Sequence, residues 1–511
     1  MFNATRALFG ACFVISFYCL NALSANAGQS GHDLVAKLDA FMEAQDAGPL
    51  APPSYTLAVA SGNELLYSRA RGTAIHGEER PLTLDTPVYI ASVTKSFMGL
   101  LAAKLDADGV LPLKSTIAEA WPELKLPAPL DPSAITMLDL LSHTSGIVND
   151  PLVIRTAYSG GTPTRDYKQI LETHSTSGER TFDYENLGYL VYAAIAEQKT
   201  GKTWQRLLND YVHTPLGLAT ASNMPSEIAP DVIGLGNDLS PLDRSGWRAA
   251  PAKSDDQMHP AGGHFISTYD AVRWLQAHVK RDVFEAGVYE AAHTQYARRE
   301  PTKKYADMSC DGYALGWNTC SYEGHRLYYH GGTYNGMMIF MMFLPDDDLV
   351  ISSINGARAM GWTFGWNTVM QALDLALELD GGADNAKRRL EGRAASQVRY
   401  LNYRVRIREA ALRKATTTDA VALRQALIGS YHSDAFGNAS VCETDDGKVM
   451  FAIGQFSAEV LATGANTFVL LERAYGEPGE VTVETPTNPV FEWEGGRFKR
   501  VDPNGCVGSE D

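Results

Sequence analysis

The feature that most constrains the fold is a pair of strand-turn-strand patterns at opposite ends of one long segment. Residues 54–69 predict two strands joined by the turn Gly62-Asn63, and residues 337–355 predict two more around a turn at 345–348. The stretch between them, about 92–280, has mainly helical periodicity. The sequence therefore predicts an α+β fold, in which an antiparallel sheet built from both ends of the segment is flanked by helices.

The composition changes after residue 380. A helical run at 364–379 precedes a charged helical stretch at 385–414 and a turn-prone threonine run. Short strand-like runs then alternate with Gly, Asn and Asp; the clearest are 429–433, 449–453, 467–471 and 498–501. We therefore predict a helical linker over 381–417 and a small antiparallel β-barrel or sandwich over 418–511.

Ser92 and Lys95 form a Ser-x-x-Lys step at the start of an apolar helix. The apolar residues that follow at helical spacing are Phe97, Leu100, Leu101 and Leu105. Ser92 is therefore expected in the first helical turn, where Lys95 shares its face and unpaired amides favour a developing oxyanion. Burial would lower the pKa of Lys95, and a neutral amine can take the serine proton. The step also occurs by chance in ordinary helices, so the prediction needs further residues.

Three downstream segments strengthen it. Leu-Leu-Ser-His-Thr-Ser-Gly at 140–146 predicts a helix that stops at Gly146. Tyr184 and Asn186 lie two apart in a loop before another helical run. Tyr-Tyr-His-Gly-Gly-Thr at 328–333 joins a β-rich segment to a glycine pair, where backbone can approach a ligand closely. Each segment is weak alone, and their order strengthens the prediction.

These elements resemble the serine β-lactamase and penicillin-binding-protein-like family, in particular class C β-lactamase-related hydrolases such as D-aminopeptidases, DD-peptidases and some esterases. The resemblance covers about 53–379 and includes Pro-Ala-Gly-Gly at 260–263. It implies a β-lactamase/transpeptidase-like sheet with a helical subdomain, placed over 28–380. The segment 418–511 resembles the lipocalin-like C-terminal domains of some D-aminopeptidase relatives.

The resemblance also implies roles for single residues. Ser92 would attack a carbonyl and form an acyl-enzyme. Lys95 and Tyr184 would share its proton, and the sequence does not decide which is the base. Asn186 would hold Lys95 or a substrate carbonyl.

The third motif supplies the remaining substrate-binding residues, His330, Gly332 and Thr333. The amides of Ser92 and Thr333 would form the oxyanion hole beside the glycines, and His330 would donate to substrate or to Tyr184. Histidine here replaces the lysine typical of β-lactamases and penicillin-binding proteins, which removes a permanent cation and argues against penicillin hydrolysis.

Glu185 is a second departure from the family pattern, because the family usually has a small residue between the tyrosine and the asparagine. Its side chain either lies beside the cleft, where it would favour a cationic group such as a free amine, or points away.

The sequence thus predicts a serine hydrolase acting on amide or ester bonds of small or peptide-like substrates, of D-aminopeptidase, DD-peptidase or esterase type. The alternatives are a slowly acylating or non-catalytic penicillin-binding or sensor protein, or a true β-lactamase. A formal charge of −16 without a basic patch argues against nucleic-acid binding. We expect no cofactor or metal, because the cysteines lack paired short spacings and no His-Glu-x-x-His occurs. His259 and His264 are interpreted as loop or packing residues. The oligomeric state stays open.

The N-terminus predicts export. Arg6 precedes an apolar run at 7–20 and Ala25-Asn26-Ala27, a pattern typical of a signal peptide over 1–27. No other stretch reaches about 18 apolar residues, so we expect no permanent membrane anchor. The protein is therefore expected to be secreted or periplasmic.

Cysteine usage agrees with export. Four cysteines lie beyond the predicted signal peptide: Cys310, Cys320, Cys442 and Cys506. They allow three connectivities, and membership in different predicted domains favours Cys310 with Cys320 and Cys442 with Cys506. An oxidising compartment would permit both disulfides.

Overall fold

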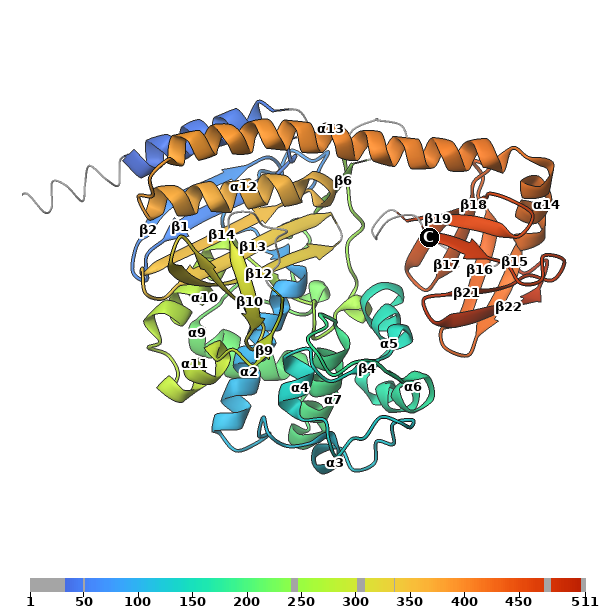
Figure 1. Ribbon diagram of the computed structural model, residues 1–511, viewed down its shortest axis with the longest axis horizontal. Coiled ribbons are helices and arrows are strands. Elements are labelled where there is room, and N and C mark those ends of the chain that lie inside the picture. Colours follow the sequence, from blue (N-terminus) through green and yellow to red (C-terminus); the bar gives the residue numbers. More distant parts are fainter. Residues whose placement is uncertain are drawn as a thin grey trace, which may run out of the picture.

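The computed structural model describes residues 33–48, 51–239, 247–300, 308–334, 336–472 and 479–506. The predicted signal peptide over 1–27 lies outside these residues. A central antiparallel sheet has helices on both faces, and a smaller barrel lies at the far end of the long helix α13 (Gly382–Ala415), as Figure 1 shows. This arrangement confirms the predicted fold class.

Eight strands form the central sheet in the order β2-β1-β14-β13-β12-β11-β10-β9. Their bounds are β1 Tyr55–Ala60, β2 Leu65–Arg71, β9 Ala297–Arg298, β10 Ser309–Tyr313, β11 Asn318–Tyr322, β12 His325–Tyr334, β13 Met337–Leu344 and β14 Leu349–Asn355. β1 pairs antiparallel with β14, from Tyr55 opposite Asn355 to Ala60 opposite Val350. This pairing joins the two predicted hairpins, so the sheet is built from both ends of the segment.

Side chains of β13 alternate between two hydrophobic cores. Ile339, Met341 and Phe343 belong to the first core, which lies between the sheet and the helices α2 (Thr94–Ala107), α10 (Thr268–Lys280) and α11 (Ala286–His293). Phe340 and Met342 belong to the second core, beneath α12 (Arg358–Ala376) and the helical residues 33–46. Successive side chains of a strand point to opposite faces, so a nearly all-apolar strand is expected at the centre of a doubly covered sheet. The helix predicted at 364–379 begins earlier, at Arg358.

A helical region lies below the sheet in Figure 1. Its helices are α3 Ile117–Ala120, α4 Met137–Leu141, α5 Asp150–Ile154, α6 Tyr167–His174, α7 Leu187–Thr200, α8 Trp204–Leu208 and α9 Thr214–Leu216. Three short strand pairs accompany them: β3 Val88–Tyr89 with β8 Phe265–Ile266, β4 Ile147–Val148 with β5 Thr176–Ser177, and β6 Asn237–Leu239 with β7 Trp247–Ala249. The helix predicted to stop at Gly146 ends at Leu141 instead. The reason is His143, whose φ of 63° cannot continue a right-handed helix.

The C-terminal strands form a nearly closed antiparallel barrel in the order β20-β19-β18-β17-β16-β15-β22-β21. Their bounds are β15 Gly429–Ser433, β16 Gly437–Glu443, β17 Val449–Ile453, β18 Phe456–Ala462, β19 Thr467–Glu472, β20 Gly479–Thr482, β21 Val490–Trp493 and β22 Gly496–Asp502. A bridge between Val483 and Phe491 brings the two edges together. Closure leaves little unpaired strand edge.

One barrel element was not predicted, the helix α14 (Thr418–Leu427). The Thr417 side chain caps its first turn by accepting from the Ala420 amide. Ala420, Leu423 and Leu427 are buried against the barrel core. The threonine run is the break between α13 and α14, as predicted, and it also supplies the N-terminal cap of the unpredicted helix.

The barrel packs against the turn Arg155–Ser159, which follows α5. The Ser159 carbonyl accepts a hydrogen bond from the Gln455 amide at 3.0 Å. Gly454 approaches so closely that a Cβ there would lie 2.3 Å from the Ser159 oxygen. Tyr158 packs among the barrel's core residues, with Tyr334 of β12 against the same cluster. The Tyr158 and Tyr334 rings lie 5.0 Å apart between centres, so the turn that contacts the barrel also adjoins the end of β12.

Both predicted disulfides are present. Cys310 and Cys320 join β10 to β11, and Cys442 of β16 is bonded to Cys506 after β22. Within the described ranges, no helix has the length and apolarity needed to cross a membrane.

Candidate active site

Ser92 lies in a single turn of 3-10 helix, Ala91–Val93, immediately before α2. The prediction placed it in the first α-helical turn; the turn is tighter, and Ala91 adopts the left-handed region at φ 49°. The preceding residue is anchored, because the Ile90 amide donates to the His264 carbonyl at 2.9 Å. This strained connection places the Ser92 side chain at the N-terminal end of α2.

Lys95 is fully buried and its amine has three oxygen neighbours. Nζ lies 3.3 Å from Ser92 Oγ, 2.7 Å from Asn186 Oδ1 and 3.0 Å from the Ala261 carbonyl oxygen. Burial lowers the pKa of Lys95 to about 7, against the opposing effect of Glu185. A substantial fraction of the amine is therefore neutral near pH 7 and able to take a proton from Ser92. Of the two roles expected for Asn186, the structure shows contact with Lys95.

Tyr184 is 44% exposed and presents its ring to the lysine. Lys95 Nζ lies 4.8 Å from the centre of this ring, within the range of a cation–π contact. The ring also packs 4.6 Å from that of His143 and 6.0 Å from that of His330. Tyr184 therefore lies beside the Ser92–Lys95 pair, and its share in proton transfer stays a prediction.

Glu185 turns its carboxylate toward the start of α7. Its two oxygens accept from the Gly188 amide at 2.8 and 3.0 Å, which caps the positive end of the helix. Burial raises the pKa of Glu185 to about 7, whereas the Gly188 bond and Lys95 lower it. Of the two orientations expected, the structure has the one in which the side chain points away from the cleft, because the carboxylate bonds to its own helix. The reason to expect Glu185 to bind a substrate amine is thereby removed.

His330 differs from its expected role. Its Nδ1 lies 2.8 Å from the Gly331 carbonyl oxygen, and its Nε2 lies 3.1 Å from the Tyr313 hydroxyl. A carbonyl can only accept, so Nδ1 carries the proton and Nε2 accepts from Tyr313. Burial and the nearby Lys95 lower the pKa of His330 to about 3. The imidazole is neutral and both of its nitrogens are engaged. The predicted donation to Tyr184 or to a substrate is therefore not what the structure shows.

Gly332 brings β12 against the Ser92 turn. A Cβ at this position would lie 2.2 Å from the Ile90 carbonyl oxygen and 3.3 Å from the Ser92 amide nitrogen. Only a glycine permits this approach. Thr333 follows on the same strand, with its hydroxyl donating to the Met337 carbonyl at 3.2 Å. The structure therefore brings the third motif to Ser92, and the pair of oxyanion amides stays a prediction.

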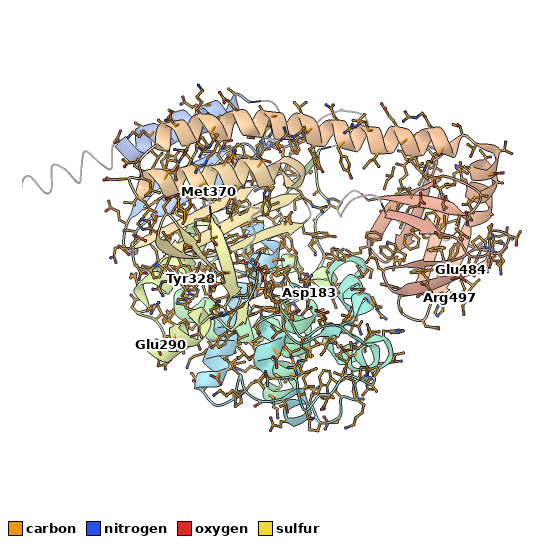
Figure 2. The ribbon with its side chains drawn as sticks, in the orientation of Figure 1. Asp183, Glu290, Tyr328, Met370, Glu484 and Arg497 are labelled. Atoms are coloured by element: carbon orange, nitrogen blue, oxygen red, sulfur yellow. A yellow bond between two sulfur atoms is a disulfide. The ribbon has the colours of Figure 1, made fainter. Side chains whose placement is uncertain are left out.

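Three residues around the site had no role in the sequence analysis. His143 is buried; its Nδ1 accepts from the Glu185 amide at 3.2 Å, and its carbonyl accepts from the amide of Asp183, labelled in Figure 2, at 2.9 Å. Tyr313 orients His330, and Ala261 contributes only a carbonyl. His143 and Ala261 lay in the 140–146 and 260–263 segments, so a sequence signal existed for both, although it gave neither a role. Tyr313 lies on a distant strand and had no such signal.

His259 and His264, interpreted from the sequence as loop or packing residues, both lie in loops. Both are buried, and the His264 ring meets Phe97 of α2 edge-on at 4.3 Å. Among the residues that the structure describes, no group of three His, Cys, Asp or Glu side chains could hold a metal ion.

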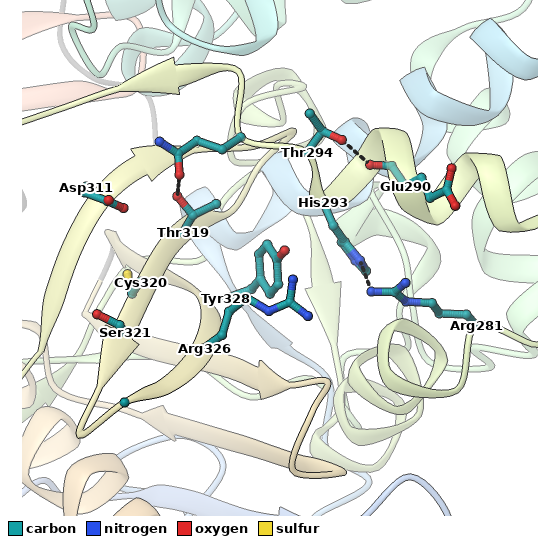
Figure 3. Close-up of a pocket in the computed structure, with 12 residues that line it drawn as sticks. Arg281, Glu290, His293, Thr294, Asp311, Thr319, Cys320, Ser321, Arg326 and Tyr328 are labelled. Atoms are coloured by element: carbon teal, nitrogen blue, oxygen red, sulfur yellow. Dashed lines mark hydrogen bonds between the residues drawn. The ribbon is translucent and has the colours of Figure 1, made fainter.

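A pocket of about 550 Å³ lies elsewhere, between α11 and strands β10 to β12 (Figure 3). Arg281, Arg326 and Tyr328 line it together with the acidic Glu290 and Asp311. Its lining includes none of the residues around Ser92, and its mixed charges select no ligand class. The chemistry of the candidate site therefore depends on the Ser92 neighbourhood.

A model of the Beta-lactamase family matches residues 38–354. Penicillin-binding protein 4 of Amycolatopsis lactamdurans is 26% identical over 319 residues, which cover 60% of this chain and 82% of that protein. The chain spans only 51% and 60% of the length of two further curated relatives.

Solved structures show the same fold. The octameric penicillin-binding protein homologue from Pyrococcus abyssi has a TM-score of 0.57 at 18% identity, over 91% of this chain and 99% of that chain. The D-amino acid amidase from Ochrobactrum anthropi SV3 has a TM-score of 0.55 at 19% identity, over 70% and 99%.

Proposed function

Because the chain belongs to the Beta-lactamase family, we propose that it is a serine hydrolase that forms an acyl-enzyme on Ser92. The observation that carries this proposal is the buried Lys95 amine, 3.3 Å from Ser92 Oγ with its pKa lowered to about 7. An alcohol is a weak nucleophile until a base removes its proton, and here the base lies in the adjacent helical turn.

The proposed reaction begins with neutral Lys95 accepting the Ser92 proton while Oγ bonds to the substrate carbonyl carbon. The carbonyl oxygen becomes an oxyanion, for which the Ser92 and Thr333 amides are the proposed donors. The bond to the leaving group then breaks, and that group takes the proton from Lys95, with Tyr184 proposed to share the transfer. Water attacks the acyl-enzyme by the same route, releasing the acid and returning the proton to Ser92.

We propose amide or ester bonds of small or peptide-like substrates as the target. Fold similarity to a D-amino acid amidase supports amide cleavage. Similarity to a penicillin-binding protein favours a second candidate, slow acylation without turnover. His330 is neutral and engaged with Tyr313, which supports the argument against penicillin hydrolysis because the site lacks the cation that lysine would supply there.

We further propose that the protein is exported. Two disulfides support this, because they persist in oxidising compartments. The division into a hydrolase domain at 28–380, a linker at 381–417 and a barrel domain at 418–511 also stays a proposal; the helix Gly382–Ala415 spans nearly all of the linker.

The test is a substrate panel with Ser92→Ala as the blank. D-alanyl p-nitroanilide, p-nitrophenyl acetate and a chromogenic cephalosporin are compared, and a fluorophosphonate probe reports acylation. We expect labelling of the native protein, turnover of the anilide or the ester, and neither in Ser92→Ala. Stable labelling without turnover would instead support the penicillin-binding candidate. A folded protein that neither labels nor turns over would refute both.

A further inference from the structure

Lys253 is a second buried lysine near the candidate site, and the proposed mechanism does not use it. Its side chain is 5% exposed, and Nζ donates to the Ala157 carbonyl at 3.0 Å and lies 3.5 Å from the Tyr89 hydroxyl. The ammonium also lies 4.5 Å from the ring centre of Tyr334 and 5.0 Å from that of Tyr89. Within the described ranges, no carboxylate pairs with it. Two tyrosines and a carbonyl thus surround a cation without a counter-charge.

This cage adjoins the Ser92 turn on two sides. Tyr89 lies in β3, three residues before Ser92. Tyr334 follows Thr333 at the end of β12, whose Gly332 packs against the same turn. His259 is within electrostatic range of both lysines, because Lys253 and Lys95 each lower the pKa of this buried imidazole. Lys253 therefore contacts both the strand that precedes the Ser92 turn and the end of β12.

A purely structural role does not explain the choice of lysine. Burying an ammonium without an anion is unfavourable, and an apolar side chain would fill the same space without that cost. Tyrosine rings offset only part of the cost. Burial accordingly lowers the pKa of Lys253 to about 7. A carboxylate that entered the cage would restore the missing counter-charge and find the Tyr89 hydroxyl as a second donor.

We propose that Lys253, framed by Tyr89 and Tyr334, binds a carboxylate of the substrate that acylates Ser92. The proposal rests on the proposed function and narrows it to substrates that carry an acidic group near the scissile bond. His330 does not serve this purpose, because it is neutral and both of its nitrogens are engaged. The proposal requires the ligand to reach the ammonium past Tyr334, the partly buried member of the cage.

The experiment uses substrate pairs that differ only in the acidic group. p-Nitrophenyl hydrogen succinate against p-nitrophenyl butyrate places the acid on the acyl side; acetyl-D-alanyl-D-alanine against its C-terminal amide places it on the leaving side. We expect kcat/KM to favour the acidic member of one pair by about ten- to a hundredfold, mainly through KM. The responding pair shows which side of the scissile bond faces Lys253.

Lys253→Met should reduce that ratio to near one, and Lys253→Arg should restore part of it. Lys199→Met removes an exposed cation from α7 and should leave the ratio unchanged. A native protein without preference in either pair would overturn the proposal, whether or not the variants fold. So would a folded Lys253→Met that keeps the preference. A native protein that a fluorophosphonate does not label would show that the proposed function itself has failed, and this inference with it.

Discussion

Replacing Gly332 with alanine should inactivate the site, whereas the same change at Gly331 should not. The two glycines are neighbours on β12, and neither has a positive φ, so both backbones accept alanine. At Gly332 the added Cβ would lie 2.2 Å from the Ile90 carbonyl oxygen and 3.3 Å from the Ser92 amide. At Gly331 the nearest atom is 3.6 Å away, an ordinary contact.

The size of the effect follows from the displacement. An ordinary Cβ contact begins near 3.4 Å, so β12 and the Ser92 turn must separate by about 1 Å. A displacement of this size between reacting groups costs about a hundredfold in rate, and loss of an oxyanion donor costs about a hundred- to a thousandfold. We therefore expect kcat/KM of Gly332→Ala to fall by at least about a hundredfold, and that of Gly331→Ala by less than about tenfold.

The assay is ester or anilide hydrolysis by the two purified variants, with thermal unfolding to show that both are folded. Labelling of Ser92 by a fluorophosphonate should slow in parallel for Gly332→Ala. Equal activities for the two folded variants would refute the packing of β12 against the Ser92 turn as the basis of the site.

Three further predictions concern the site and the barrel. The kcat/KM of the native protein should rise with pH through about 7, because Lys95 must be neutral and burial lowers its pKa to about 7; a flat profile from pH 5 to 9 would contradict this. Glu185→Gln should move that rise to lower pH, since the Glu185 charge raises the pKa of Lys95; an unchanged or higher midpoint of the profile would exclude the coupling. Gly454→Ala should destabilise the protein by about 1–3 kcal/mol more than Gly437→Ala, because both have positive φ but only Gly454 faces a carbonyl, at 2.3 Å; chemical denaturation measures the difference, and equal losses would argue against the tight barrel contact.

The sheet and barrel could be predicted because their strands carry local signals. Turn residues after Ala60 and after Leu344 mark both hairpins, and β1 then pairs with β14. Elements set by a single backbone angle were missed. The positive φ of His143 ends α4 early, and that of Ala91 tightens the turn at Ser92; neither residue type announces such a conformation.

The contacts of the candidate site also fall into two groups, those set by local sequence and those set by tertiary packing. Ser92 and Lys95 are three residues apart on one helical turn, so their contact follows from local geometry. The Ala261 carbonyl and the Tyr313 hydroxyl reach the site from distant segments, and their contacts depend on how the sheet and helices pack. Glu185 shows the limit most clearly. Its position in the loop could be predicted, but the direction of its carboxylate follows from the Gly188 amide, which lies in the first turn of α7 and bonds to the carboxylate instead of to a helix carbonyl.

Burial is the main cause of the low pKa of Lys95, and the two imidazoles beside it are uncharged. His143 and His330 are buried beside it, and Lys95 is among the causes that lower the pKa of both. A proton on either imidazole would repel the ammonium, but burial keeps both uncharged near pH 7. Glu185 is thus left as the charge that opposes burial of the lysine, and its own pKa is raised to about 7. The two groups titrate in the same range and interact, so the loss of a proton near pH 7 belongs to the pair. Because this pair loses a proton near pH 7, the Lys95 amine can be neutral there and can accept the proton of Ser92.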